Sequence, residues 1–189
     1  MKKLVLFASG SGSNFQAVID AVKTQKLSAE ITGLVASREG IGAIDRAVDH
    51  NISYTIIQEP DPQKESEKLN ELLNQWDPDL IVLAGYLKKI PAFLINRYRN
   101  AIINIHPSLL PKFGGHGYYG LRVHQAVIEA GETQTGCTVH YVTEEYDQGA
   151  VIRQEIVPVF ENDTPESLAK RVLKAEHKLL PEVIAELIN

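Results

Sequence analysis

The stretch Ala101-Ile102-Ile103-Asn104-Ile105-His106-Pro107-Ser108-Leu109-Leu110-Pro111 is the part of the sequence that decides the fold class. It is an apolar strand rich in β-branched residues that ends abruptly at a proline. Because residues two apart in a strand point to the same side, Asn104 and His106 project together from the strand's carboxyl end. Open α/β sheets bind their ligands at that end. An amide donor beside an imidazole suits a reaction in which a carbonyl oxygen gains charge while a proton moves, so the stretch favours acyl transfer.

The segments before this stretch alternate between strand and helix patterns. Near-continuous apolar strands separated by amphipathic helices predict an α/β fold of three layers, with a mostly parallel, doubly wound sheet. Two later segments alternate more strongly and predict an added strand pair, antiparallel to each other, before a closing helix that begins at Thr164 and Pro165. We expect strands at 3–8, 31–37, 54–57, 80–84, 102–106, 134–142 and 151–159, and helices at 14–26, 43–50, 63–76 and 92–98.

Composition limits the possible functions only modestly. A length of 189 residues, 44% hydrophobic and 23% charged, predicts one domain, 1–189. The formal net charge of -5 gives no overall attraction to nucleic acid or to an anionic membrane. The apolar run after Lys2 and Lys3 is too short to span a bilayer, and we expect a cytoplasmic protein.

The sequence predicts no metal site. His116, His124 and His140 match no helical histidine pair, and we interpret them as loop, helix and strand residues. The single cysteine, Cys137, has no partner thiol and is interpreted as a small buried side chain.

A glycine-serine loop, Gly10-Ser11-Gly12-Ser13-Asn14, joins the first strand to the first helix. Its backbone amides and the helix N-terminus suit a phosphate monoester, although glycines in the turn and a cap by Ser13 or Asn14 would explain it equally well. A dinucleotide site would need a third glycine where Phe15 stands, and the lysine of a nucleoside-triphosphate loop is missing. Ser37-Arg38 after the second strand keeps an NADP-dependent reductase open as an alternative.

Asp147 lies in the glycine-containing connection between the two late strands. Turns favour aspartate for local reasons alone. An imidazole in acid-base chemistry, however, needs a third group that sets its tautomer and supports its cation. Asp147 is therefore either a turn residue or the partner of His106.

Three motifs together give the chain a family resemblance: the loop at residues 10–14, the run from Asn104 to Pro111, and the segment from Gly136 to Gly149. They resemble the folate-dependent formyltransferases, which have a Rossmann-like fold, and the loop resembles the branch that formylates glycinamide ribonucleotide. The resemblance implies 10-formyltetrahydrofolate as co-substrate, without a metal. It also implies that residues 10–14 bind the ribonucleotide phosphate, that Asn104 and His106 bind the formyl oxygen, and that Asp147 assists proton transfer.

The same resemblance implies further contacts. Glu176 matches an acid that meets the acceptor substrate. Lys64 matches a cation near the phosphate or the folate tail, although a solvated side chain is an equal alternative. The phosphate would lie in the half 1–100, whereas the folate would occupy the half 101–189, with small molecules as the only partners of a monomer or homodimer. The folate contacts implied are Lys64, Leu87, Lys88, Lys89, Ile90, Asn104, Val142, Thr143, Glu144 and Asp147.

Some features differ from the family pattern. The loop 113–120 is longer and richer in glycine, which suggests a mobile lid. Lys88-Lys89 stands where an arginine and an apolar residue are expected.

Other members and other functions remain alternatives. A methionyl-tRNA formyltransferase would carry a further nucleic-acid-binding domain, whereas this chain ends at Asn189 directly after its closing helix. A formyltetrahydrofolate hydrolase would add an N-terminal regulatory domain and lack the phosphate loop. The hydrolase, the NADP-dependent reductase and a sensor that binds without turnover are the alternatives that an assay must separate.

Overall fold

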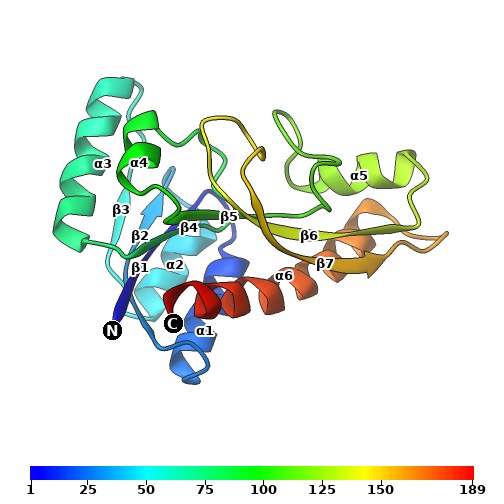
Figure 1. The fold of residues 1–189 in the computed structure, drawn as a ribbon, viewed down its shortest axis with the longest axis horizontal. Coiled ribbons are helices and arrows are strands. Elements are labelled where there is room, and N and C mark those ends of the chain that lie inside the picture. Colours follow the sequence, from blue (N-terminus) through cyan, green and yellow to red (C-terminus); the bar gives the residue numbers. More distant parts are fainter.

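The computed structural model describes residues 1–189 and contains one sheet of seven strands in the order β3-β2-β1-β4-β5-β6-β7 (Figure 1). The first five strands run parallel, β6 is antiparallel to β5, and β7 is antiparallel to β6. The predicted mostly parallel α/β sheet and its antiparallel added pair are therefore confirmed. The strands are β1 Lys2–Ala8, β2 Ala29–Ala36, β3 Tyr54–Ile56, β4 Leu80–Leu83, β5 Ile102–His106, β6 Gln134–Tyr141 and β7 Val151–Pro158.

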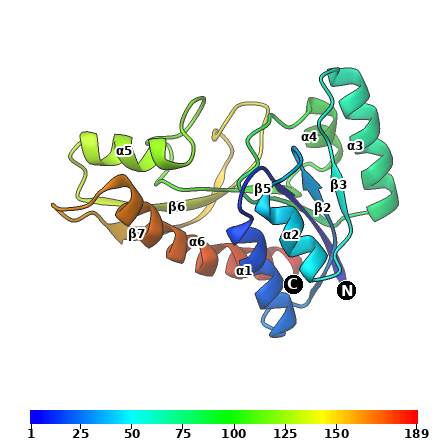
Figure 2. The same ribbon diagram turned by 180° about the vertical axis from the view of Figure 1, so that it is seen from behind.

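Helices cover both faces of this sheet, as Figures 1 and 2 show from opposite sides. In β1, Leu4 and Leu6 belong to a core of 29 buried residues shared with α1, α2 and α6. Val5 and Phe7 belong to a second core of 12 buried residues, shared with α3 and α4. Alternate residues of one strand thus feed the two cores. The helices are α1 Ser13–Lys23, α2 Gly42–Asp49, α3 Pro62–Trp76, α4 Ala92–Arg97, α5 Leu121–Glu129 and α6 Pro165–Ile188.

The strand order reverses between β1 and β4, and the loops that follow these two strands are joined there. The backbone N–H of Ser9 donates to the Gly85 carbonyl at 3.0 Å, and the Leu87 N–H donates to the Ser9 hydroxyl at 3.0 Å. Doubly wound sheets bind ligands at such a reversal, outside the carboxyl ends of the strands. The fold therefore places its natural binding site beside the glycine-serine loop and the end of β5.

The observed elements differ from the predicted ones mainly at their ends. The first helix ends at Lys23 instead of 26, because the chain turns through Gln25 at a φ of 58°. Thr164 caps α6 through its side chain and Pro165 occupies the first turn, as predicted. The sequence patterns do not delimit helix α5, although they predict that His124 lies on a helix. Cys137 is fully buried, as predicted.

The helices also bear on the membrane question. None of them combines the length and the apolar composition that crossing a bilayer requires.

Candidate active site

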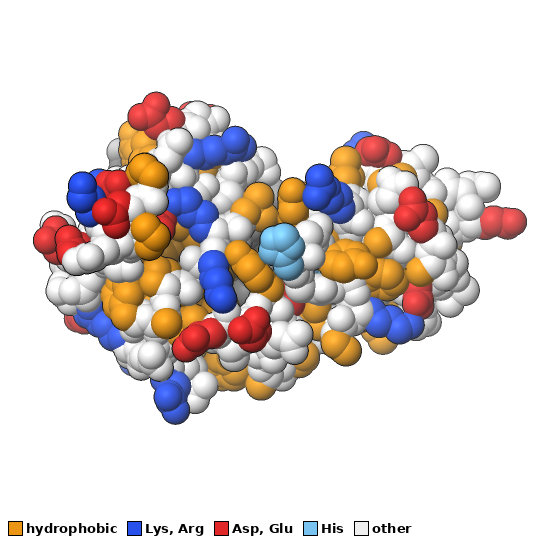
Figure 3. All heavy atoms as spheres, turned by 90° about the horizontal axis from the view of Figure 1, so that it is seen from above, with side chains coloured by type: hydrophobic (Ala, Val, Ile, Leu, Met, Phe, Trp, Pro, Cys, Tyr) orange, Lys and Arg blue, Asp and Glu red, His pale blue; other side chains and the backbone are white.

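A cavity of about 640 Å³ opens beside the end of β5, between the segment after β4 and the loops around β6. Figure 3 shows the molecule hollowed on this side, with apolar side chains gathered around a histidine. Most of the predicted site residues line the cavity. They are Asn14, Leu87, Lys88, Lys89, Ile90, Asn104, His106, Val142, Thr143, Glu144, Asp147 and Glu176.

The predicted trio Asn104, His106 and Asp147 meets at the end of β5. Asp147 Oδ2 lies 3.5 Å from His106 Nδ1, and Asp147 Oδ1 lies 3.5 Å from the Asn104 amide nitrogen. The Gly115 N–H donates to Asp147 Oδ2 at 2.8 Å, which fixes the carboxylate. Asp147 itself has a φ of 56°, so it is a turn residue as well as the neighbour of His106. The two interpretations of Asp147 are thus compatible.

His140 is a fourth member of this cluster, and the sequence predicts it only as a strand residue. The antiparallel register places it directly opposite Asn104. Its Nδ1 lies 2.8 Å from the Tyr141 carbonyl, so Nδ1 carries the proton and Nε2 accepts from the Asn104 amide at 3.1 Å. His140 Nε2 also lies 3.5 Å from Asp147 Oδ1. His140 therefore orients the Asn104 amide, and the second N–H of that amide points to Asp147 Oδ1 at 3.5 Å, a long contact that a ligand oxygen can replace.

Hydrogen bonding also assigns the proton on His106. Its Nε2 donates to the Phe113 carbonyl at 2.8 Å, because a carbonyl oxygen can only accept. Nδ1 is then the nitrogen that exchanges a proton with Asp147 or with a substrate.

Burial and charge act in opposite directions on this pair. Burial lowers the pKa of His106, although the Asp147 carboxylate and the bond to Phe113 oppose that shift. For Asp147, burial alone would raise the pKa, but the neighbouring His140 side chain, the His106 charge and the Gly115 N–H outweigh it and leave the pKa lowered. A carboxylate that stays ionised beside a largely neutral imidazole is suited to support a transient imidazolium.

A buried polar network holds the segment after β5. Thr138 Oγ1 donates to the Ser108 carbonyl at 2.7 Å and accepts from the Leu110 N–H at 3.1 Å. Gln154 on β7 donates to the Leu110 carbonyl at 3.0 Å. Both added strands therefore fix the turn that carries the carbonyl partner of His106.

The glycine-serine loop presents free amides. The Gly10 carbonyl accepts from the Ala43 N–H at 3.1 Å and the Ser11 carbonyl accepts from Arg46 Nε at 2.8 Å, while no backbone N–H of residues 10–14 has a partner. Gly12, not Ser13 or Asn14, is the residue before α1, and no side chain caps this helix. Unoccupied amides at a helix N-terminus form an anion site. Gly10, Ser11, Gly12 and Ser13 do not line the main cavity, which only Asn14 reaches.

A buried acid joins the loop to the far end of the chain. Glu176 is 6% exposed, and its Oε2 accepts from the Asn14 amide at 2.6 Å. Burial raises the pKa of Glu176 to about 6, against the lowering effect of that hydrogen bond. Asn14 Oδ1 is buried without a partner. Glu176 is therefore not part of the solvated face of α6, since its side chain faces the cavity.

The predicted folate segment 87–90 lines the cavity with its backbone available. The Lys88, Lys89 and Ile90 N–H groups have no protein partner. Lys88 Nζ donates to Glu65 at 2.6 Å and to the Ile57 carbonyl at 3.0 Å, so its charge is neutralised by α3. This arrangement favours recognition of a ligand through the backbone of 88–90.

Lys64 is not brought to the other predicted residues. It lies exposed in the first turn of α3, where Asp61 caps the helix, and it does not line the cavity. A direct contact between Lys64 and a ligand in this cavity is therefore not expected, because α3 directs it into solvent.

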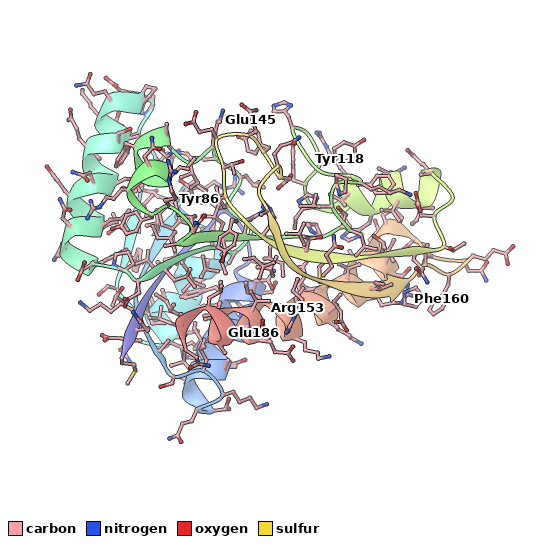
Figure 4. All side chains as sticks on the ribbon, viewed as in Figure 1. Tyr86, Tyr118, Glu145, Arg153, Phe160 and Glu186 are labelled. Atoms are coloured by element: carbon pink, nitrogen blue, oxygen red, sulfur yellow. The ribbon has the colours of Figure 1, made fainter.

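Two loops form the rim of the cavity. Figure 4 shows Tyr118 on the glycine-rich loop 113–120 and Glu145 on the connection between β6 and β7, both above the sheet. The His116 and Tyr146 rings approach each other edge to face, with centroids 6.2 Å apart, and both line the cavity. The mobile lid stays a prediction.

Comparisons with known proteins agree with this geometry. A family model described as formyl transferase matches residues 2–184. No group of three or more histidine, cysteine or acidic side chains is arranged to hold a metal ion.

Individual relatives are similar over nearly the whole chain. A chloroplastic phosphoribosylglycinamide formyltransferase of Vigna unguiculata is 44% identical over 98% of this chain, which spans only 61% of that relative's length. The phosphoribosylglycinamide formyltransferase of Escherichia coli is 36% identical over 96% of this chain and 85% of its own length. The crystal structure of glycinamide ribonucleotide transformylase 1 from Geobacillus kaustophilus superimposes with a TM-score of 0.91 at 41% identity, covering 100% of both chains.

Proposed function

Because the chain belongs to the formyl transferase family, we propose that it transfers the formyl group of 10-formyltetrahydrofolate to the amine of glycinamide ribonucleotide. The products are formylglycinamide ribonucleotide and tetrahydrofolate, a step of purine biosynthesis. One observation carries the proposal: Asn104, His106 and Asp147 meet inside a cavity that Glu176 also lines.

In the proposed reaction the neutral amine attacks the formyl carbon directly. The formyl oxygen gains negative charge and accepts hydrogen bonds from an N–H of Asn104 and from His106 Nδ1 once that nitrogen is protonated. Asp147, 3.5 Å from His106 Nδ1, supports the imidazolium and passes the proton from the attacking nitrogen to the leaving nitrogen of the folate. No covalent enzyme intermediate is needed, and alignment of two substrates in one cavity supplies much of the remaining acceleration.

Each substrate has its own part of the site in this proposal, and the phosphate lies beside the cavity, which the loop reaches only through Asn14. The ribonucleotide phosphate takes the free amides of residues 10–14, and Glu176 with Asn14 meets the part that carries the amine. The folate lies along 87–90, where the N–H groups of residues 88–90 are unpaired, and against 142–147. Lys88 contributes backbone contacts, since its side chain is bound to Glu65.

The proposal extends to the working form of the protein. We propose a cytoplasmic enzyme that acts on small molecules as a monomer or homodimer, with no nucleic acid or membrane as partner. The net charge of -5 supports this choice, because it repels anionic polymers and surfaces.

The decisive experiment supplies both substrates and follows tetrahydrofolate by absorbance and formylglycinamide ribonucleotide by mass spectrometry. We expect both products in equal amounts, and tetrahydrofolate only when glycinamide ribonucleotide is present. Release of formate without the ribonucleotide would instead identify a formyltetrahydrofolate hydrolase. Binding of both substrates without products would identify a sensor.

The reductase alternative is tested in the same preparation. A change in nicotinamide absorbance with NADPH would support it. Ser37 and Arg38, on which that alternative depends, do not line the cavity.

A further inference from the structure

His124 is a cavity residue that the proposed reaction does not yet use. It lies on α5, which packs against α6, the helix that carries Glu176. Its side chain lines the same cavity as the catalytic trio, although only 4% of the residue is exposed.

The ring nitrogens of His124 lack the partners that the other cavity histidines have. His106 and His140 each donate a ring N–H to a backbone carbonyl at 2.8 Å. His124 Nδ1 is buried without any hydrogen bond, and Nε2 has no protein partner either. Because Nε2 is not enclosed by protein, it is the nitrogen that faces the cavity. Buried polar groups are normally paired, so an unpaired imidazole at a cavity wall indicates a missing ligand group.

The protonation state of the ring follows from the same surroundings. A buried N–H without an acceptor is rarer than a buried acceptor without a donor, so the proton belongs on Nε2 and not on Nδ1. Burial, and then the charge of His106, lower the pKa of His124 to about 4, which keeps the ring neutral at physiological pH. His124 therefore offers one uncharged N–H donor to the cavity.

We propose that His124 Nε2–H binds an uncharged oxygen of the acceptor substrate, the amide carbonyl or a ribose hydroxyl, and so helps to select glycinamide ribonucleotide. This inference rests on the proposed function. The position of His124 favours the ribonucleotide over the folate as its ligand. Helix α5 packs against α6, which carries Glu176, whereas the proposed folate segments follow β4 and β6. A phosphate is a poor match, since it would favour a charged imidazole that this buried site disfavours.

A purely structural role for His124 would predict a different environment for its ring nitrogens. A side chain kept for stability would have its buried nitrogen paired, whereas Nδ1 is unpaired and costs free energy. If His124 serves to bind the substrate, replacing the ring by a similar apolar side chain should leave stability unchanged or increase it, while binding of the substrate is weakened.

The test compares three variants at steady state with both substrates. His124→Leu removes the donor, His124→Gln restores an N–H near the position of Nε2, and His50→Leu makes the same change outside the cavity. We expect His124→Leu to raise the KM for glycinamide ribonucleotide about tenfold, with kcat and the KM for the folate within about twofold of wild type. The Gln variant should recover most of the loss, and the His50 variant should behave as wild type.

A measurement on the unchanged protein keeps the test decisive if the Leu variant unfolds. Nitrogen NMR of the wild-type histidines should show His124 protonated at Nε2, and this resonance should move when glycinamide ribonucleotide is added alone. Any of three results would overturn the inference: protonation at Nδ1, a resonance that does not move, or equal KM values in wild type and a folded His124→Leu. The proposed function would still stand in each case if wild-type turnover is normal. Absence of wild-type turnover would overturn the proposed function itself.

Discussion

Replacing Glu176 by glutamine should stabilise the protein and weaken its binding of the acceptor substrate at the same time. Burial raises the pKa of Glu176 from 4.5 to about 6, so ionisation is disfavoured in the folded state. The stabilisation that this shift supplies is complete below pH 4.5 and is lost as the pH rises through 6. At pH 8 the ionised side chain therefore costs about 2 kcal/mol, since one pKa unit is about 1.4 kcal/mol.

Glutamine imitates the protonated acid, so Glu176→Gln removes that cost. We expect its free energy of unfolding to exceed that of wild type by about 2 kcal/mol at pH 8, equivalent to about 4 to 8 °C in Tm. The difference should vanish near pH 4.5. Urea unfolding at several pH values measures it. Glu186→Gln, an exposed change on the same helix, is the control and should alter stability by less than about 1 kcal/mol.

Binding should respond in the opposite direction. Glutamine lacks the negative charge that accepts most strongly from the substrate, so the KM for glycinamide ribonucleotide should rise about tenfold while folate binding stays near wild type. An equal stability gain at pH 4.5 and pH 8 would refute the assignment of a raised pKa. An unchanged KM would separate Glu176 from the acceptor substrate.

Three further predictions concern the trio and the loop. Asp147→Asn keeps an acceptor for the Gly115 N–H but removes the charge beside His106. Turnover should therefore fall by about two to four orders of magnitude while both substrates still bind. Near-normal turnover with an unchanged pH-rate profile would remove Asp147 from the mechanism. Changing Asn104 or His106 to alanine should each cost about two to three orders of magnitude in turnover, and the double change should cost less than their product; multiplicative losses would show independent action. Gly10 is a position where an added Cβ meets nothing within 4 Å. In binding titrations, Gly10→Val should weaken binding of the ribonucleotide and leave binding of the folate unchanged. An equal loss of affinity for both would count against the phosphate site.

The structure decides which glycine makes a clean test of the loop. Gly12 is the obvious choice from the sequence, but a Cβ there would lie 2.7 Å from the Ala43 Cα, and its φ is 72°. A side chain at Gly12 would displace α2 from the loop before any phosphate approached. Gly10 carries neither problem, so a loss of binding there reports on the ligand.

The sequence was sufficient for the sheet and for the pair of Asn104 and His106 because their signals are local, whereas the residues alone left the role of Asp147 open. Strand periodicity, a proline stop and an Asn-x-His spacing within β5 all lie inside a few residues. Contacts between distant segments are different. The Asn14 amide meets Glu176 across 162 residues, and no periodicity in either helix predicts that pairing.

His140 and α5 were missed for related reasons. His140 becomes a partner of Asn104 only through the pairing register of β5 and β6, which the intervening loop and packing decide. Helix α5 follows a segment with four glycines between residues 113 and 120, which reads as loop and hides the helix start. A histidine directly opposite a functional asparagine would have been the signal, once the register was known.

The antiparallel strand pair is what turns a general binding site into a catalytic one. The parallel part of the sheet supplies the phosphate loop after β1 and the Asn104 and His106 pair on β5. Without β6 and β7, however, Asn104 would have no His140 to orient it, and Asp147 would not reach His106. The same strands also hold the turn after β5 through Thr138 and Gln154. Changes that loosen this strand pair should therefore lower turnover more than ribonucleotide binding, since the hydrogen bonds that hold the phosphate loop come from α2, α6 and the segment after β4 and not from β6 or β7.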